Sequence, residues 1–252
     1  MHVAQISDTH IQTRDRSARS RLDDLDRTVA SINALRPRPA AVLHTGDVAH
    51  DGAPSDYAAA REILCELACP VFATVGNKDG RGAFRQAFAP DGYMRGDAGF
   101  VQYAVELGAL RVVAVDTLDA DSNLGAFCAA READLRRLLS SPAELPTLVF
   151  LHHAPVPLPD MARQPLQFRD PRRAAALARC IAECRNVIGV VAGHVHRTRL
   201  VAFEETMLST APSIAADLSK EKLPGRYAGR PVYHLHAVDG ARMASASVLV
   251  EP

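Results

Sequence analysis

The stretch "HVAQISDTH" (residues 2–10) joins a short β-type run directly to a carboxylate and an imidazole, those of Asp8 and His10. Four later runs have the same form, an apolar segment that ends in a polar turn: "AAVLHT" (40–45), "VFATV" (71–75), "TLVFLH" (147–152) and "VIGVVA" (187–192). Most of these runs are apolar on both faces, which is typical of strands buried in the middle of a layered structure. The sequence therefore predicts five buried strands.

Helical patterns separate these runs. Apolar residues recur at intervals of three and four within 22–35, 58–67, 135–139 and 171–184, and Pro171 suits a first helical turn. From Thr198 onward the pattern changes to successive strands, "TRLVAF", "TMLST", "PVYHLHAV" and "ARMASASVLV". We therefore predict an α/β fold, a two-sheet sandwich flanked by helices.

Length and composition favour one compact domain. The chain has 252 residues, of which 48% are hydrophobic, enough for a substantial core. We predict a single domain over residues 1–252 that closes with C-terminal strands at 231–250. The polar, glycine-containing stretch "LSKEKLPGRYAGR" (218–230) is predicted to be a loop that contacts substrate or a second subunit.

The charge balance excludes a general polyanion binder. Lys plus Arg and Asp plus Glu both number 29, so the formal net charge is zero. We therefore expect neither a nucleic acid nor a membrane surface as partner. The first residues lack the pattern of a secretory signal, and no apolar run approaches the roughly 20 residues of a membrane span. A cytoplasmic location is the resulting prediction.

Metal-ligand residue types follow each buried strand. Side chains at the carboxyl ends of adjacent strands converge on one crevice, where open α/β sheets place their sites. Carboxylate, imidazole and amide oxygen together suit Zn, Mn, Fe or Co. Seven ligands are too many for one ion, and a bridging carboxylate would imply two ions roughly 3.5 to 4 Å apart. The candidate ligands are Asp8, His10, Asp47, Asn77, His152, His194 and His196.

The order of these motifs resembles the calcineurin-like metallophosphoesterases. The motifs are Asp8-x-His10, Gly46-Asp47, Gly76-Asn77, His152-His153 and Gly193-His194-Val195-His196, and the resemblance covers residues 3 to about 215. Within that superfamily, "HHAPVPL" and "GDVAHDGAPSDYAAAREIL" are similar to bacterial class III cyclic nucleotide phosphodiesterases and glycerophosphodiesterases. The resemblance implies the α/β/β/α metallophosphoesterase fold and hydrolysis of small phosphodiesters. A homodimer is also compatible with this family.

The resemblance further implies how the ligands are shared. Asp8, His10, Asp47 and His196 would hold one of two divalent or trivalent ions. Asp47, Asn77, His152 and His194 would hold the other, with Asp47 as the bridge. A hydroxide between the ions would attack phosphorus in line. The adjacent His153 is given either a supporting or substrate-side role, or the role of a hydrogen-bonded structural histidine.

One position departs from the family pattern. Relatives usually carry histidine after Gly76-Asn77, where it faces the phosphate and helps the leaving oxygen depart, but this chain has Lys78. An ammonium offers charge to a phosphoryl oxygen and lacks the near-neutral proton exchange of imidazole. Loss of that acid would hurt diesters with poor leaving groups most. Alternatively, Lys78 reads the extra charge of a phosphomonoester or phosphonate monoester, or it is a solvated turn residue.

Asp79 and two late histidines are the other polar residues of interest. Asp79 is predicted to be a turn residue or a carboxylate that orients a ligand. His234 and His236 alternate along a late strand without an acidic or cysteine partner, so we expect them to be structural. A metal-loaded binding protein without activity is the alternative from another functional class, which retention of every candidate ligand disfavours.

Overall fold

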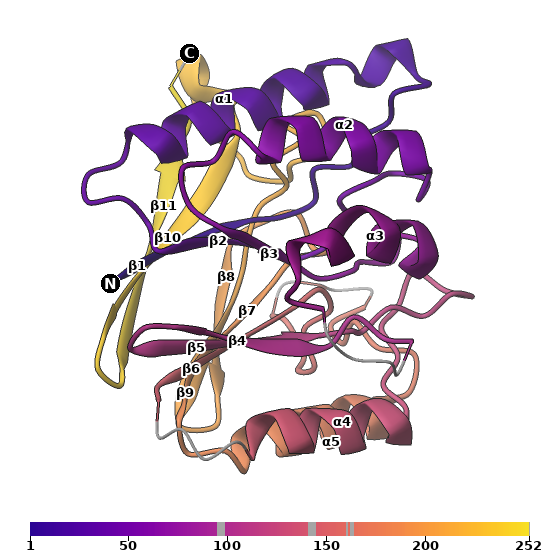
Figure 1. Cartoon of the computed structure of the whole chain (residues 1–252), viewed down its shortest axis with the longest axis vertical. Coiled ribbons are helices and arrows are strands. Elements are labelled where there is room, and N and C mark those ends of the chain that lie inside the picture. The colour runs from indigo at the N-terminus through magenta and orange to yellow at the C-terminus, as the bar shows by residue number, and fades with distance from the viewer. Residues whose placement is uncertain (95–98, 141–144, 160, 162–163, 252) are drawn as a thin grey trace.

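The computed structural model describes residues 1–94, 99–140, 145–159, 161 and 164–251. Two β-sheets face each other in the middle of the molecule, and helices cover their outer surfaces (Figure 1). The predicted two-sheet sandwich flanked by helices is therefore confirmed. Whether the whole chain is one independent domain stays a prediction.

The first sheet has the strand order β11-β10-β1-β2-β3. Its strands are β1 (His2–Ile6), β2 (Ala41–His44), β3 (Val71–Ala73), β10 (Val232–Asp239) and β11 (Arg242–Leu249). β1 pairs in parallel with β2, and β2 pairs in parallel with β3, whereas β10 runs antiparallel to β1. The carboxyl ends of β1, β2 and β3 consequently lie at one edge of this sheet.

The second sheet has the order β4-β5-β6-β7-β9-β8. Its strands are β4 (Tyr103–Leu107), β5 (Leu110–Val115), β6 (Thr147–Leu151), β7 (Val187–Ala192), β8 (Arg199–Phe203) and β9 (Thr206–Thr210). β5, β6, β7 and β9 are parallel, and antiparallel strands close both edges. The carboxyl ends of β6 and β7 thus lie together.

Helices pack in two groups. The α-helices are α1 (Ser20–Ala34), α2 (Pro54–Leu64), α3 (Arg81–Phe88), α4 (Ala129–Leu139) and α5 (Pro171–Ala182). Short 3-10 turns occur at Arg16–Ala18, Ala89–Asp91 and Gly225–Tyr227. α1, α2 and α3 lie beside the first sheet, and α4 and α5 cover the outer face of the second (Figure 1). Each helix has one apolar face, and it buries this face against the outer surface of a sheet.

The central strands divide their side chains between two apolar cores. Along β6, Leu148 and Phe150 point between the sheets, while Val149 and Leu151 point toward α4 and α5. This alternation follows from the two-residue period of a strand. It explains why the run is apolar on both faces, as the sequence analysis inferred.

The β4–β5 hairpin and α3 were not predicted from the sequence. The charged residues Glu106 and Arg111 interrupt the apolar run, but they lie opposite each other in the hairpin register. The polar stretch 218–230 is a loop with one 3-10 turn, as predicted, and its contact role stays a prediction. No helix in the described residues is long and apolar enough to cross a membrane, and the cytoplasmic location stays a prediction.

Candidate metal centre

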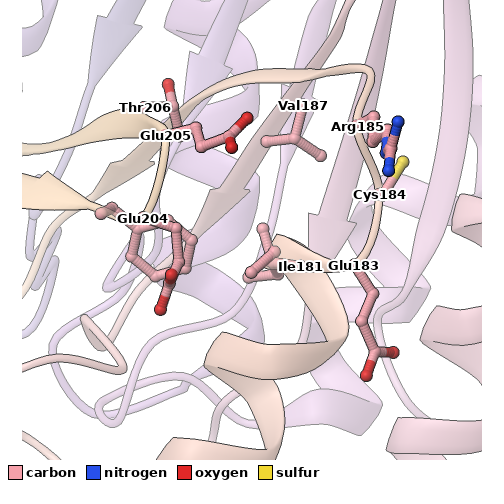
Figure 2. Close-up of a pocket in the computed structure, with 10 residues that line it drawn as sticks. Ile181, Glu183, Cys184, Arg185, Val187, Glu204, Glu205 and Thr206 are labelled. Atoms are coloured by element: carbon pink, nitrogen blue, oxygen red, sulfur yellow. The ribbon is translucent and has the colours of Figure 1, made fainter.

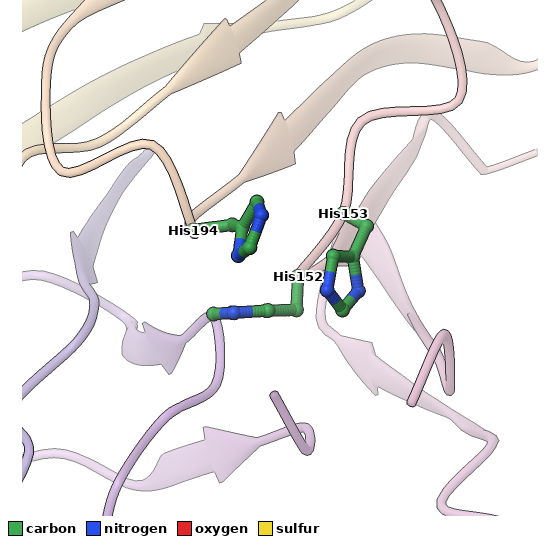
Figure 3. A group of neighbouring side chains, drawn as sticks. All are labelled: His152, His153 and His194. Carbon is green, nitrogen blue, oxygen red and sulfur yellow. The ribbon is translucent and has the colours of Figure 1, made fainter. Parts of the chain in front are cut away.

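The candidate ligands lie in the turns that directly follow β1, β2, β3, β6 and β7. Their ligand atoms form overlapping groups, within each of which the atoms lie no more than 4.8 Å apart. The groups are Asp8/His10/His196, Asp8/Asp47/His152 and His152/His153/His194, the last of which appears in Figure 3. Asn77 lies against the third group, so the structure brings together all seven candidate ligands.

One half of the cluster surrounds the carboxylate of Asp8. Its Oδ1 atom lies 3.2 Å from His196 Nε2 and 3.7 Å from His10 Nε2. The two ring nitrogens are themselves 3.2 Å apart. Asp8 Oδ1 is buried without a hydrogen-bond partner in the described residues. Nitrogen and oxygen lone pairs that converge on one point are a donor set that a cation fits.

The other half surrounds the side-chain oxygen of Asn77. Asn77 Oδ1 lies 2.9 Å from His194 Nδ1 and 3.1 Å from His152 Nε2. Asp47 Oδ2 lies 3.5 Å from His152 Nε2 and 3.6 Å from His10 Nε2. Asp47 therefore stands between the two halves, the position that a bridging carboxylate requires.

The ring orientations are fixed by atoms outside the cluster. His152 Nδ1 lies 2.7 Å from the carbonyl oxygen of Thr45, and His196 Nδ1 lies 2.9 Å from that of Leu218. A carbonyl oxygen only accepts, so each Nδ1 carries the proton and leaves Nε2 free to bind a metal. His10 Nδ1 faces His50 Nδ1 at 3.3 Å, which makes His50 the corresponding support for His10.

The backbone is left-handed at five of the seven candidate ligands. The φ angles are positive at Asp8 (54°), His10 (46°), Asp47 (55°), His194 (71°) and His196 (57°). L-residues adopt this region at a cost of about 1–3 kcal/mol each, and such residues gather at functional sites. The turns after β1, β2 and β7 are therefore shaped to aim side chains inward, and the surrounding fold maintains the strain.

Glycines allow the strand ends to approach one another. A Cβ atom on Gly76 would lie 2.2 Å from Asp47 Oδ1, and one on Gly193 would lie 2.1 Å from Ser7 Oγ. On Gly46 it would lie 2.7 Å from both Gly76 N and His152 Nδ1. These distances are far below any real Cβ contact, so the cluster can form only because these positions have no side chain.

Charges within the cluster favour a cation at its centre. Burial alone would raise the pKa of the Asp8 carboxyl, but His196, His10 and His152 outweigh it and hold the pKa well below its usual range. Burial likewise opposes the charged form of His152, yet Asp47 and Asp8 raise its pKa to about 9. The two carboxylates thus stabilise positive charge beside them, whether it comes from a proton or from a metal ion.

Asp79 holds the turn that carries Asp47. Its carboxylate accepts hydrogen bonds from the amides of Gly76, Val48 and Ala49, and from Tyr57 Oη. Burial, together with the nearby Asp47 charge, raises the pKa of Asp79 to about 6. Of the two readings from the sequence, the structure favours a carboxylate that orients the ligand turn over a simple surface turn residue.

Lys78 and His153 lie beside the cluster in different ways. The Lys78 amide donates to Asp47 Oδ1 at 2.7 Å, while its ammonium has no hydrogen bond or ion pair with the described residues. His153 is fully buried, with Nδ1 2.9 Å from Thr117 Oγ1 and Nε2 3.3 Å from the Asn123 carbonyl oxygen. His153 therefore has protein partners on both ring nitrogens, which suits a supporting role.

Sequence reasoning missed Thr117 and Asn123. Asn123 Oδ1 accepts from Asn77 Nδ2 at 3.3 Å, so this residue contacts a candidate ligand as well as His153. The only signal is the polar turn "DSNLG" (121–125), which resembles any surface loop.

A cavity of about 570 Å³ lies away from the cluster, between the end of α5 and the β8–β9 turn (Figure 2). Ile181, Glu183, Arg185, Glu204 and Glu205 are among its lining residues, and none of the candidate ligands lines it. This cavity therefore contributes no residue to the candidate metal centre.

Comparisons with known proteins agree with this geometry. The family model of the calcineurin-like phosphoesterases matches residues 1–198. The chain is 29% identical to the glycerophosphodiester phosphodiesterase GpdQ of Enterobacter lignolyticus, over 84% of this chain and 77% of that protein. It is 29% identical to the 3',5'-cyclic adenosine monophosphate phosphodiesterase CpdA of Pseudomonas aeruginosa, over 89% of this chain and 83% of that protein.

A probable cyclic nucleotide phosphodiesterase of Rhodopseudomonas palustris is 35% identical over 78% of this chain and 72% of that protein. Among solved structures, a dimetal phosphatase from Danio rerio has the same fold, with a TM-score of 0.72 and 13% identity over 100% of this chain and 99% of that one. These matches confirm the family resemblance and the expected enzyme class, a phosphoric ester hydrolase. The chain belongs to the calcineurin-like phosphoesterase family.

Proposed function

We propose that this protein is a dinuclear metal-dependent phosphodiesterase that acts on small molecules. The observation that carries the proposal is the position of Asp47, whose Oδ2 atom faces His10 of one half and His152 of the other at nearly equal distances of 3.6 and 3.5 Å. Asp8, His10, Asp47 and His196 would hold one ion. Asp47, Asn77, His152 and His194 would hold the second.

When bound, two such ions would neutralise phosphoryl oxygens and lower the pKa of a water molecule. The chain's own residues prepare this site. Thr45 and Leu218 orient imidazoles through their carbonyl oxygens, and the three close glycines let carboxylates from different strands share one space. Fe, Mn, Zn and Co all accept this mixed ligand set, so the donor set leaves the choice of metal open.

Lys78 is proposed to act on the substrate side, and His153 is proposed to support the site. Lys78 directly follows the candidate ligand Asn77, so its ammonium can offer its charge to a phosphoryl oxygen. His153 holds the 117–123 turn, and Asn123 from that turn holds the amide of Asn77. The names of the relatives support cyclic nucleotides and glycerophosphodiesters as substrate classes.

A second candidate is hydrolysis of a phosphomonoester or phosphonate monoester. It is favoured by the Lys78 ammonium, which has no ionic partner among the described residues and could pair with an additional anionic oxygen. Under this alternative, Lys78 binds the additional negative charge of the substrate and does not take over the proton donation of the histidine usual in relatives.

A steady-state comparison distinguishes the candidates. After reconstitution with Mn(II), rates are measured on bis(p-nitrophenyl) phosphate, p-nitrophenyl phosphate and a p-nitrophenyl phosphonate, with metal content determined on the same sample. We expect about two metals per chain and preference for the diester. Preference for the dianionic monoester would support the second candidate, and no turnover with two bound metals would support a binding protein. A sedimentation measurement on the same sample tests the homodimer, which stays a prediction.

A further inference from the structure

We propose that Arg21 is a positioning residue of the metal centre, because its guanidinium ties the turn that carries His10 to the segment that orients His196. Residues 213–220 form that segment, the strap. The inference rests on the proposed function, because it takes His10 and His196 to be metal ligands. Arg21 itself has no atom in the cluster.

Arg21 makes its contacts from the first turn of α1. Its Nη1 atom donates to the His10 carbonyl oxygen at 3.1 Å, while Nη2 and Nε donate to Asp217 at 2.9 and 3.2 Å. The residue is only 8% exposed. A guanidinium this buried is costly unless its donors are paired, and its rigid fork suits two acceptors in different directions. The pairing therefore specifies one arrangement of the two segments.

The strap continues from Asp217 into contacts with His196. The Leu218 carbonyl oxygen accepts from His196 Nδ1 at 2.9 Å, and the Lys220 amide donates to the His196 carbonyl oxygen at 2.8 Å. One turn further along α1, Asp24 Oδ2 accepts from the Ala216 amide at 2.9 Å. Helix α1 thus fastens the strap at the residues directly before the one that orients His196.

The other end of the strap contacts the turn after β1. Ser213 Oγ donates to the Asp8 carbonyl oxygen at 2.7 Å, and the Ile214 amide donates to the Ser7 carbonyl oxygen at 2.9 Å. The strap therefore lies along both ligand turns on this side of the cluster, and Arg21 links its far end back to His10. His10 and His196 are 186 positions apart in the chain, yet their Nε2 atoms must converge.

If only its charge mattered, removing Arg21 would strengthen metal binding, whereas a positioning role predicts that removal weakens it. A guanidinium close to bound cations repels them, so its neutral replacement should tighten metal binding if Coulomb repulsion dominates. If Arg21 acts by position, the same replacement loosens His10 and the strap and weakens metal binding. The sign of the change in affinity separates the two explanations.

The test measures Mn(II) binding to the full chain by calorimetry, for wild type, Arg21→Gln and Arg21→Lys. Loss of supports outside the ligand set typically costs 10- to 100-fold in metal affinity. We expect Arg21→Gln to weaken one of two sites by about 10- to 100-fold. Arg21→Lys keeps the charge but cannot reach both partners, so we expect a smaller weakening. In the metal-free Arg21 variants, hydrogen exchange of a peptide covering 213–220 should be faster than in metal-free wild type.

Arg61→Gln is the matched control. Arg61 also lies on a helix, α2, and pairs through both Nη atoms with Asp91 in a distant segment, but it does not contact the cluster. We expect its Mn(II) affinities and the exchange of the strap to match wild type.

Unchanged or tighter binding in both Arg21 variants, with unchanged exchange of the strap, would overturn this inference while leaving the proposed function intact. A wild-type chain that binds no Mn(II), Zn(II) or Co(II) would instead overturn the proposed function and this inference with it. Faster exchange in the metal-free Arg21 variants supports the link from Arg21 to the strap when it is confined to the strap, because a general loss of stability would speed exchange in other segments as well.

Discussion

The chain contains two His-x-His pairs, and they have different environments. His234 and His236 lie within the regular strand β10 and are buried. His236 contacts Gln5 Oε1 and Ser245 Oγ, and His234 contacts Thr198 Oγ1. Neither forms an ion pair with a carboxylate in the described part of the chain. Burial lowers the pKa of His234 to about 4 and that of His236 to about 3, so both are neutral structural groups, as the sequence predicted.

His194 and His196 lie just beyond β7, where the backbone becomes left-handed. There they meet Asp8 and Asn77, which come from the ends of other strands. The spacing of two histidines is therefore uninformative by itself. Position at a strand end, together with carboxylates from neighbouring strand ends, distinguishes a candidate metal site from a hydrogen-bonded pair in the core.

Removing the central carboxylate should have the largest effect. Asp47→Asn keeps a side chain that tolerates positive φ but removes the charge between the two halves. We expect loss of metal retention and a fall in kcat/KM of at least a thousandfold, about 4 kcal/mol in transition-state stabilisation. Metal analysis and diesterase assays check this outcome. A fully metallated, active variant would contradict the dinuclear model.

Asparagine at one histidine of each pair tests their difference directly. His194→Asn should lower activity roughly a hundredfold or more, since it removes a proposed ligand. His236→Asn should leave kcat/KM within about twofold of wild type but lower the free energy of unfolding by about 1–3 kcal/mol, because Gln5 Oε1 loses a buried partner. Assays and urea unfolding measure both quantities. If both variants lost activity without loss of stability, the distinction between the pairs would be wrong.

The lowered pKa of His236 in the structural pair His234/His236 leads us to expect that stability depends on pH. The pKa of His236 is lowered from 6.5 to about 3, so below pH 6.5 the unfolded chain binds a proton that the folded chain does not. Stability is then fully present above pH 6.5 and falls as the pH decreases toward 3. We expect His236→Asn to reduce this slope by roughly 1.4 kcal/mol per pH unit between about pH 5.5 and 4. Equal slopes in urea titrations of both proteins would refute the buried neutral state of His236.

Lys78→His should have the smallest effect on the fold and a selective effect on rate. An imidazole restores near-neutral proton donation, so we expect a gain of about tenfold on unactivated alkyl diesters and little change on aryl diesters. The ratio of the two rates is the measurement, with wild type as reference. Equal changes on both substrates would show that residue 78 does not lie at the leaving group.

The strands and their ends were readable from the sequence because buried strands are apolar on both faces and their ends carry unusual polar residues. The β4–β5 hairpin was missed because charged residues interrupt its pattern. Asn123 and the strap were missed for another reason. Their contacts with Asn77 and His196 join segments distant in the chain, and no local pattern records such a pairing. The left-handed turns at the ligands likewise depend on the assembled strand ends.

The close approach of Gly46, Gly76 and Gly193 to ligand turns also matters for engineering. A library that diversifies the residues around this cluster for new substrates should keep these three codons fixed. Any side chain there would collide with the turns that carry Asp8, Asp47 or His152, so most such clones would be lost before selection on substrate begins. Lys78 contacts Asp47 only through its backbone amide, so it is a position where randomisation can change selectivity while retaining the scaffold.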